Sequence, residues 1–352
     1  MSTLTPPSSL PTTIKTVQVQ ADFSSKCVSA SPLALPHKGA IIQMTACGLC
    51  GSDLDKIINQ KAKPGMVLGH EVTGIIHDLC PEYDGVFQIG DRIVTSHHVP
   101  CLHCHYCQSG CESMCRTFKS TNLKPGGFSE YFSMTEGHLN HTAFKIPDTI
   151  TDAEASCIEP LSCVVKAIRK SHQLTPDVAQ QPERSATVIG LGFIGLMATQ
   201  VYTQQGYQVT GYELNPERQQ LALEQGFCTN VNTPPETLKH SMDTVFLSAL
   251  SPQTLEIALT LVRDAGTLIL FSSSLNSKSK PILDPDILYF REISVIPSYS
   301  PNLEDLRNAA ELIFNQQINV QSLCTHTKPL DSFDEALTLY QSGEAIKVVI
   351  TP

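Results

Sequence analysis

The stretch ATVIGLGFIG, residues 186–195, determines how the second half of the chain folds. In it a β-rich apolar run leads into a glycine-rich turn, and a second apolar run of helical character follows. Gly190 permits a tight turn, Gly192 removes a side chain that would block a pyrophosphate, and Gly195 lets helix and strand pack closely. The helix start would offer free backbone N–H groups to phosphates, those of Phe193 and Ile194. The stretch therefore predicts a dinucleotide-binding turn, although an ordinary strand-to-helix turn can have the same spacing.

The strand expected next, Tyr207–Tyr212, is followed by an acidic residue. Glu213 lies 21 residues after Gly192, where a carboxylate can accept hydrogen bonds from an adenosine ribose and would repel a 2′-phosphate. This spacing favours NAD over NADP. Two alternatives stay open, because Glu213 also suits a helix N-cap or a surface charge, and because Arg218 offers a cation that keeps NADP possible.

The texture of the sequence changes near Pro160. From about Thr16 to Ile146, short apolar runs are broken by Gly, Pro and Asn, which is typical of strands and loops. Beyond Pro160, longer periodic segments alternate with short β-rich runs, and this alternation predicts a parallel sheet covered on both faces. We expect helices over 161–170, 194–205, 217–225 and 254–262, and strands over 186–189, 207–212, 244–247 and 267–271. A polar connection is expected over 171–184.

Length, composition and charge limit the function classes. With 352 residues the chain is long enough for about two domains. Its 24 Lys and Arg against 34 Asp and Glu leave a formal charge of −10, so we expect neither nucleic acid nor an anionic membrane as a partner. No run of about 18 apolar residues is present, and residues 1–15 do not resemble an export signal, so a cytoplasmic location is expected. The 13 cysteines then suggest metal rather than disulfides.

Four of these cysteines form a regular cluster. The spacing Cys101-x2-Cys104-x2-Cys107-x7-Cys115 places four thiols on one short loop. Four thiolates predict a closed tetrahedral zinc site, which leaves no position for substrate and therefore serves structure. The alternatives are disulfides, a zinc ribbon that contacts nucleic acid, and competing ligands within the loop, namely His103, His105 and Cys111.

A second set of potential ligands is dispersed. It comprises CGLCGSD at 47–53, GHE at 69–71 and EPL at 159–161. Taken singly, these residues also suit a core cysteine, a turn histidine or a helix N-cap. We expect four other cysteines to be small core residues: Cys47, Cys157, Cys163 and Cys228.

In this order, the motifs make the chain similar to the zinc-dependent medium-chain alcohol dehydrogenases, in their polyol (sorbitol) and threonine dehydrogenase branch. The resemblance extends along nearly the whole chain and includes GDR at 90–92, GGFSEY at 126–131 and AIKVVI at 345–350. It implies a GroES-like β-rich catalytic domain over 1–155 with the structural zinc loop, and a doubly wound Rossmann domain over 156–296 that binds NAD. The segment 297–352 would return to the catalytic domain.

The resemblance also implies roles for the residues of these motifs. Cys50, His70 and Glu159 would bind the catalytic zinc, and Glu71 is similar to the family's alternative ligand. One thiolate, one imidazole and carboxylates would leave an open position on this zinc for water or an alcohol. The ion would act there as a Lewis acid and lower the pKa of an alcohol. Ser52 would take the proton of the alcohol. Asp53 would hold the second nitrogen of His70 and so fix its tautomer.

The chain departs from the family at the residue five positions after Cys50. Many relatives have a histidine there that continues proton transfer to solvent, whereas this chain has Asp55. Its carboxylate could accept the proton, or transfer could proceed through cofactor ribose and water. His98 lies where threonine dehydrogenases carry a histidine that lines the substrate site, which makes it a candidate catalytic residue. For His97 we expect a structural or exposed position.

The expected activity is the NAD-linked interconversion of a secondary alcohol and its ketone. The substrate would be a small molecule: a polyol, a sugar derivative or a hydroxy amino acid. The alternatives are a primary alcohol or aldehyde substrate, and a relative that binds zinc and NAD without turnover. Because Glu292–Ile296 and the Pro-Ser-Tyr that follows resemble the family's dimer-forming strand region, a homodimer or homotetramer is implied.

Overall fold

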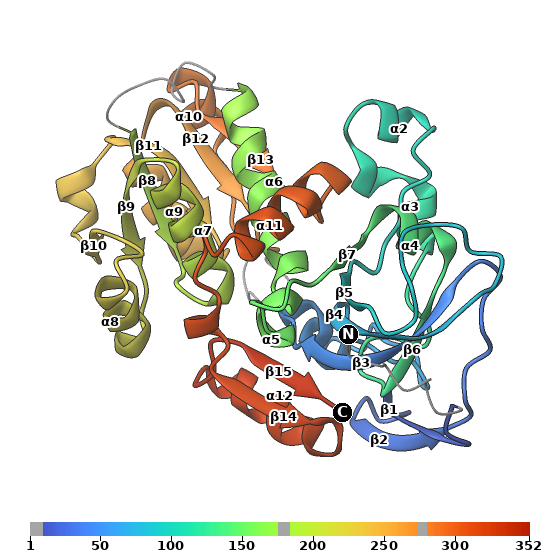
Figure 1. Ribbon diagram of the computed structural model, residues 1–352. Helices are drawn as coiled ribbons and strands as arrows, with labels where there is room; N and C mark the ends of the chain where they lie inside the picture. Colours follow the sequence, from blue (N-terminus) through green and yellow to red (C-terminus); the bar gives the residue numbers. More distant parts are fainter. Residues whose placement is uncertain (1–9, 175–183, 274–279) are drawn as a thin grey trace. The chain divides into compact units, whose positions relative to one another are not determined.

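The computed structural model describes residues 10–174, 184–273 and 280–352. The chain divides into two compact units (Figure 1). Unit 1 comprises Met1–Pro160 and Asn302–Pro352, and unit 2 comprises Leu161–Pro301. The last segment of the chain therefore belongs to the same unit as the first.

Unit 2 is built on a six-stranded sheet whose neighbouring strands are all parallel. The strand order is β10-β9-β8-β11-β12-β13, which reads 3-2-1-4-5-6 when the strands are numbered within the unit. This is the order of the doubly wound Rossmann fold, so the predicted fold class is confirmed for this unit. The strands are β8 (Arg184–Ile189), β9 (Tyr207–Tyr212), β10 (Asn230–Val231), β11 (Met242–Leu247), β12 (Val262–Leu270) and β13 (Ser294–Pro297). The helices are α6 (Ile158–Leu174, which begins in unit 1), α7 (Phe193–Gln204), α8 (Pro216–Glu224), η3 (Pro235–Leu238), α9 (Pro252–Leu261) and α10 (Pro285–Phe290).

Side-chain caps determine where two of these helices begin. Asn215 accepts hydrogen bonds from the N–H groups of Glu217 (2.9 Å) and Arg218 (3.3 Å) at the start of α8. At the start of α9, Ser251 accepts one from the N–H group of Thr254 (3.2 Å). Both caps satisfy N–H groups that have no partner within the helix. Most of the polar connection expected over 171–184 lies outside the described residues, and α6 continues to Leu174.

Unit 1 contains a mixed sheet and a separate hairpin. The sheet has the order β14-β15-β3-β4-β5-β7, and β6 also pairs with β3. Its strands are β3 (Ala40–Gly48), β4 (Glu71–Leu79), β5 (Arg92–Thr95), β6 (Tyr131–Met134), β7 (Ala143–Lys145), β14 (His326–Pro329) and β15 (Val348–Thr351). The hairpin consists of β1 (Ile14–Val19) and β2 (Ser25–Ala30). The helices are α1 (Gly51–Ile58), α2 (His105–Gln108), η1 (Glu112–Met114), α3 (Arg116–Ser120), α4 (Glu136–His141), α5 (Asp152–Ser156), α11 (Leu303–Phe314), η4 (Gln321–Leu323), η5 (Leu330–Ser332) and α12 (Phe333–Ser342).

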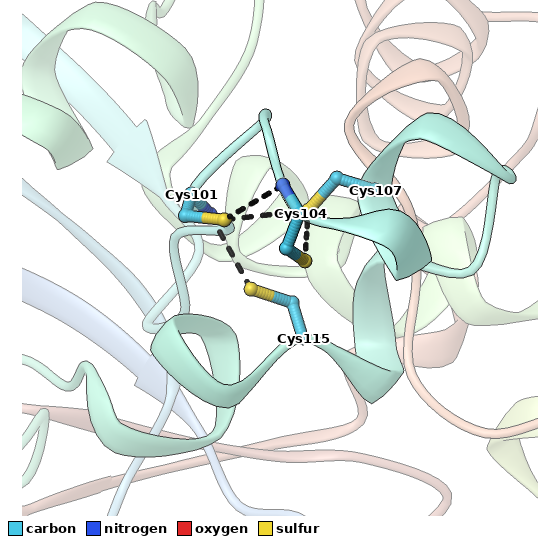
Figure 2. Close-up of side chains that lie close together, drawn as sticks. All are labelled: Cys101, Cys104, Cys107 and Cys115. Atoms are coloured by element: carbon cyan, nitrogen blue, oxygen red, sulfur yellow. Dashed lines mark hydrogen bonds between the residues drawn. The ribbon is translucent and has the colours of Figure 1, made fainter.

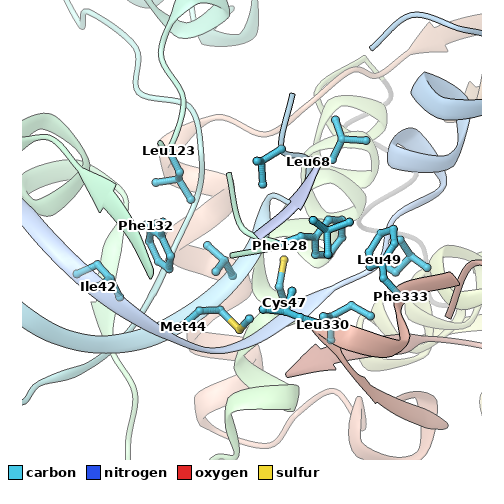
Figure 3. Packing of buried hydrophobic residues seen from close by; sticks show 14 of the residues in the cluster. Ile42, Met44, Cys47, Leu49, Leu68, Leu123, Phe128, Phe132, Leu330 and Phe333 are labelled. Atoms are coloured by element: carbon cyan, nitrogen blue, oxygen red, sulfur yellow. The ribbon is translucent and has the colours of Figure 1, made fainter. Parts of the chain in front are cut away.

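An apolar core joins the early strands of unit 1 to its C-terminal segment (Figure 3). Cys47 is fully buried within it, which confirms that this cysteine is a core residue. Phe128 packs against Phe333 of α12 with ring centroids 4.8 Å apart. Burial of each such aromatic side chain contributes roughly 1.5–3 kcal/mol, so this core holds both ends of unit 1 together.

The described residues include no helix that combines the length and apolar character required to cross a membrane.

Candidate active site

The four-cysteine loop brings its sulfur atoms together as the spacing predicts. All four Sγ atoms, from Cys101, Cys104, Cys107 and Cys115, lie within 4.8 Å of one another (Figure 2). The Sγ atom of Cys107 is 3.6 Å from that of Cys104 and 4.0 Å from that of Cys101. A tetrahedral site with Zn–S bonds of about 2.3 Å has edges of about 3.8 Å, whereas a disulfide bond is about 2.05 Å. These distances fit zinc and do not fit disulfides.

Backbone N–H groups within the loop point at the sulfur atoms. The N–H group of Cys104 is 3.4 Å from the sulfur of Cys101, and that of Cys101 is 3.5 Å from the sulfur of Cys115. Burial by itself raises the pKa of Cys115, but the N–H groups of Cys101 and Phe118 lower it to about 6. Because the thiolate is the form that binds zinc, this environment favours metal binding. The competing cysteine, Cys111, is exposed and lies outside the cluster.

The dispersed motifs form a second group of ligand atoms. Atoms of Cys50, His70 and Glu71 lie within 4.8 Å of one another. Cys50 is the N-cap of α1, and Glu71 is the first residue of β4. Strands β3 and β4 are antiparallel and pair with Gly48 opposite Glu71. The residues that follow β3 therefore meet those that precede β4 at one end of this strand pair. A thiolate, an imidazole and a carboxylate are donors that zinc accepts, so this group fits the metal.

Asp53 determines the orientation of His70. One carboxylate oxygen of the fully buried Asp53 lies 3.3 Å from Nδ1 of His70 and also accepts from the N–H group of Gly69. The other oxygen accepts from the N–H group of Cys50 at 3.2 Å. Burial would raise the pKa of Asp53, but His70 brings it below its usual value. Nδ1 of His70 is thus engaged, and its Nε2 faces Ser52, whose hydroxyl oxygen is 3.4 Å away.

Glu159 lies near this group but is not part of its compact set. Its side chain is buried, and one carboxylate oxygen is 3.9 Å from Nδ1 of His97. Burial raises the pKa of Glu159 to about 7, and the charge of His70 opposes that rise. A carboxylate in such a place requires a nearby cation to remain ionised.

A buried lysine that the sequence analysis missed pairs with Glu71. Nζ of Lys347 forms an ion pair with Glu71 and donates a hydrogen bond to the carbonyl of Leu49 (3.1 Å). Lys347 is 2% exposed, and burial lowers its pKa, yet the charges of Glu71 and Cys50 raise that pKa above its usual value overall. A Cβ at Gly48 would lie 2.0 Å from the Glu71 carboxylate and 2.7 Å from the Lys347 side chain. The signal in the sequence was a single lysine within the apolar ending AIKVVI.

The two neighbouring histidines differ in their surroundings. His98 lies against Phe118, with ring centroids 4.7 Å apart, and its Nδ1 donates to the carbonyl of Thr121 at 2.6 Å. His97 instead lies beside His70, at 4.9 Å between ring centroids, and beside Glu159. Burial lowers the pKa of His98 to about 4 and that of His97 well below its usual value. Among the described residues, Nδ1 of His97 is buried and has no hydrogen-bond partner.

Two further residues of unit 1 have defined positions near α1. The hydroxyl of Tyr340 on α12 comes within 2.9 Å of where a Cβ would stand at Gly51, and burial raises the pKa of Tyr340 to about 12. Asp55, which stands where relatives have the relay histidine, is engaged by Lys61 and Asn59, each at 2.6 Å. Its carboxylate is thus already engaged by two donors.

The glycine-rich turn in unit 2 has the geometry that its spacing predicts. Gly190 has a φ of +90°, which favours glycine, and a Cβ at Gly195 would lie 1.8 Å from the carbonyl of Gly190. Gly192 is the N-cap of α7, whose first residues are Phe193 and Ile194. The helix start at Gly192 and the absence of a side chain there suit a pyrophosphate.

Glu213 lies next to this turn. One oxygen of its carboxylate accepts a hydrogen bond from the N–H group of Leu191 at 2.7 Å, and the other accepts from those of Leu214 and Asn215. Arg218 is also close, since its guanidinium nitrogen would be 3.7 Å from a Cβ at Gly192. These residues fit a dinucleotide at the turn, with the acidic side chain of Glu213 and the basic side chain of Arg218 beside it.

The comparisons with known proteins agree with both units. The family "Alcohol dehydrogenase GroES-like domain" matches residues 36–148, and "Zinc-binding dehydrogenase" matches residues 194–315. A sorbitol dehydrogenase of Halalkalibacterium halodurans is 28% identical over 96% of this chain and 98% of its own length. An L-threonine 3-dehydrogenase of Alteromonas mediterranea is 25% identical over 89% of this chain and 92% of its own.

The fold has close counterparts among solved structures. Acetophenone reductase from Geotrichum candidum, solved in complex with NAD, superposes with a TM-score of 0.85 at 22% identity, covering 98% of this chain and 99% of the reductase. The two matched domains, the donor sets suited to zinc and the dinucleotide turn occur together in one chain. The chain therefore belongs to the zinc-dependent medium-chain alcohol dehydrogenases, enzymes that interconvert a CH–OH group and a carbonyl group with zinc and NAD(P).

Proposed function

We propose that this protein oxidises the secondary alcohol of a polyol, or of a related hydroxy compound, to the ketone with NAD, and catalyses the reverse reduction. The observation that carries the proposal is the compact set of Cys50, His70 and Glu71, with His70 oriented by Asp53. The relatives named for sorbitol and L-threonine support the secondary alcohol, because both compounds carry one.

We assign the catalytic zinc to Cys50, His70 and Glu159, with Glu71 as an alternative ligand. Bound there, zinc would supply Lewis-acid chemistry that lowers the pKa of the substrate alcohol. Lys347 neutralises Glu71 and holds its carboxylate, which leaves the buried Glu159 as the carboxylate ligand in this state of the site. The four-cysteine loop would bind the structural zinc.

We assign to Ser52 the role of accepting the proton of the alcohol. The hydroxyl of Ser52 lies 3.4 Å from Nε2 of His70. Asp53 keeps His70 in one tautomer by holding Nδ1. Because Asp55 is engaged by Lys61 and Asn59, we propose that the proton leaves Ser52 through water rather than through Asp55.

The surroundings of His97 support a polyol, rather than an alcohol with a single hydroxyl, as the substrate. Its Nδ1 has no hydrogen-bond partner among the described residues, and it lies 3.9 Å from the Glu159 carboxylate. Two polar atoms at that separation can both contact one hydroxyl at about 2.8 Å. We therefore assign His97, in place of His98, to a second hydroxyl of the substrate.

The cofactor NAD, which would supply the hydride acceptor when bound, is assigned to the glycine-rich turn of unit 2. Glu213 would accept hydrogen bonds from the ribose hydroxyls and repel the extra phosphate of NADP. Arg218 lies close to Gly192 and is assigned to the pyrophosphate.

We also propose a homodimer or homotetramer in the cytoplasm. Tyr289 and Phe290, exposed by 77% and 78%, precede the edge strand β13, and Tyr299, exposed by 63%, follows it. Exposed aromatic residues beside an unpaired sheet edge favour pairing with a second copy. None of the 13 cysteines, all of which lie among the described residues, forms a disulfide bond, which suits a reducing compartment.

The test is a zinc analysis combined with an activity screen. Purified protein should contain two zinc ions. It should reduce NAD faster with sorbitol, L-threonine or 2-butanol than with 1-butanol. With any of these substrates, it should reduce NAD faster than NADP. Turnover of primary alcohols alone would reverse the substrate assignment. Two zinc ions without NAD reduction on any of these alcohols would indicate a non-catalytic relative.

A further inference from the structure

A third group of metal-ligand side chains lies in unit 1, and neither the reaction nor the structural loop uses it. It consists of His37, Cys80 and Glu82, whose ligand atoms lie within 4.8 Å of one another. Cys80 is buried, while His37 and Glu82 are exposed. The group shares no residue with the four-cysteine loop or with the Cys50 set.

The sheet holds these three residues together. His37 lies just before β3, and Cys80 directly follows β4, whose Leu79 pairs with Ala40 of β3. The N–H group of Cys80 donates to the carbonyl of Gly39 at 2.9 Å, which extends this pairing to the turn. Strand pairing therefore holds the backbone near these ligands in place. Only short side-chain movements would be needed to bring the three ligand atoms into metal-binding geometry.

The thiol of Cys80 is already directed at an anionic partner. Its Sγ lies 2.7 Å from a carboxylate oxygen of Glu82. The hydrogen bond from Cys80 is the largest cause that lowers the pKa of Glu82, and the charges of His37 and Lys38 add to it. A divalent cation placed here would replace the shared proton and meet one sulfur, one nitrogen and one oxygen ligand. Lys38 also forms an ion pair with Glu136 at 3.4 Å, so its charge is partly compensated.

We propose that His37, Cys80 and Glu82 form a third metal site, which binds Zn²⁺ through imidazole nitrogen, thiolate sulfur and carboxylate oxygen. Water completes the tetrahedron, and the thiol proton passes to solvent when the metal binds. The site lies at the opposite end of β4 from Glu71, on the order of 25–30 Å from the proposed active site. Its metal links the start of β3 to the end of β4 and stabilises unit 1 without taking part in hydride transfer.

A cobalt titration tests this assignment independently of activity. The purified protein is dialysed until two zinc ions per chain remain, those of the catalytic and structural sites, and is then titrated with Co²⁺. The third site should lose its metal during this dialysis, because His37 and Glu82 are exposed. We expect one further equivalent to bind and to produce thiolate-to-cobalt charge-transfer absorption. The variant Cys80→Ser should lose this absorption, and His37→Gln and Glu82→Gln should weaken binding by roughly tenfold or more. Cys27→Ser, which changes a thiol of unit 1 outside all three groups, is the matched control and should bind as the parent does.

Two outcomes would overturn the proposal. One is the absence of any charge-transfer absorption on adding Co²⁺. The other is absorption of equal strength in Cys80→Ser, which would show that Co²⁺ had exchanged into another cysteine site. If Cys80→Ser does not fold, the exposed positions His37 and Glu82 carry the test. Added Zn²⁺ should then raise the melting temperature of the parent but not that of His37→Gln.

Discussion

The four-cysteine loop and the Cys50 group both gather metal ligands within 4.8 Å, but they are assembled differently. The loop takes all its ligands from residues 101–115, and its own backbone N–H groups point at the sulfur atoms. The Cys50 group takes its ligands from the residue that precedes α1 and from the start of β4, with Glu159 of α6 nearby and a lysine from the C-terminal segment beside them. A local site depends on short-range geometry, whereas a dispersed site depends on the register of a whole sheet.

The surroundings of the two groups differ in the same way. The dispersed group is embedded among buried charges, since Asp53 faces His70 and Lys347 faces Glu71. The loop contains four like ligands and is attached to the rest of unit 1 at its outer part, where Asn302 donates to the carbonyl of Gly110 at 2.7 Å. We therefore expect damage to the dispersed group to reduce activity, and damage to the loop to reduce stability.

Replacement of a ligand in the dispersed group tests the first half of this contrast. Cys50→Ser should reduce turnover on the order of a thousandfold or more, because the Lewis acid is worth several kcal/mol in the transition state. One zinc ion per chain should remain, and the melting temperature should change little. Steady-state kinetics, zinc analysis and calorimetry measure the three quantities. Loss of both zinc ions would contradict the independence of the two sites.

Replacement of a ligand in the loop tests the second half. Cys104→Ser should destabilise the protein by several kcal/mol, since closed zinc sites contribute on the order of 10 kcal/mol to folding. The activity per folded molecule should remain within a few-fold of the parent. Denaturant unfolding and active-site-normalised kinetics report the two effects. Cys111→Ser, in the same loop but outside the cluster, should behave as the parent.

Lys347 connects stability and activity at the dispersed group. Lys347→Met should destabilise unit 1 by roughly 3–5 kcal/mol, because it leaves the buried Glu71 without its cation. It should also alter metal affinity, since Glu71 is released toward Cys50 and His70. Lys347→Arg should restore most of the stability. An unchanged zinc affinity in Lys347→Met would show that the lysine has only a structural role.

His97 tests the substrate assignment on a smaller scale. His97→Phe should raise the KM for sorbitol by roughly tenfold, equivalent to about 1.4 kcal/mol, because one hydrogen bond to a hydroxyl is lost. The KM for 2-butanol, which has no second hydroxyl, should stay near that of the parent. His98→Phe is the matched control. An equal loss for both substrates would exclude selective recognition by His97.

The smallest expected effect belongs to His138, a buried histidine of α4 that is in neither ligand group. Its Nε2 donates to the carbonyl of His97 at 3.1 Å, and its Nδ1 accepts from the hydroxyl of Thr135 at 2.8 Å. Burial lowers its pKa, so the unfolded chain takes up a proton at a higher pH than the folded protein. Stability should be complete above about pH 6.5 and should fall as the pH decreases below that value.

Unfolding curves at several pH values measure this dependence. His138→Gln keeps a donor and an acceptor but cannot titrate, so its stability should change less between pH 7 and pH 5 than that of the parent. An identical slope in the two proteins would assign the acid sensitivity to other groups.

Features that depend on neighbours in the chain could be predicted from the amino-acid sequence alone. The Rossmann sheet, the turn at Gly190 and the cluster of four thiols all follow from local spacing, because a turn, a helix start or a short loop determines its own geometry. For the same reason, strand β9 was predicted at residues 207–212 without error. In the less regular first half of the chain, strand β4 begins only at Glu71, because the preceding residues form the loop that carries His70.

The arrangement around the dispersed group was decided only by the tertiary structure. His97 and His98 are adjacent and their ring centroids lie only 3.8 Å apart, so which of them lies beside His70 depends on how the chain packs. The contacts of Glu71 with Lys347, and of Cys80 with His37, join residues that are distant in sequence. Such contacts follow from the register of β3 with β4 and from the return of the C-terminal strand to unit 1, and neither is encoded in the spacing of any single motif.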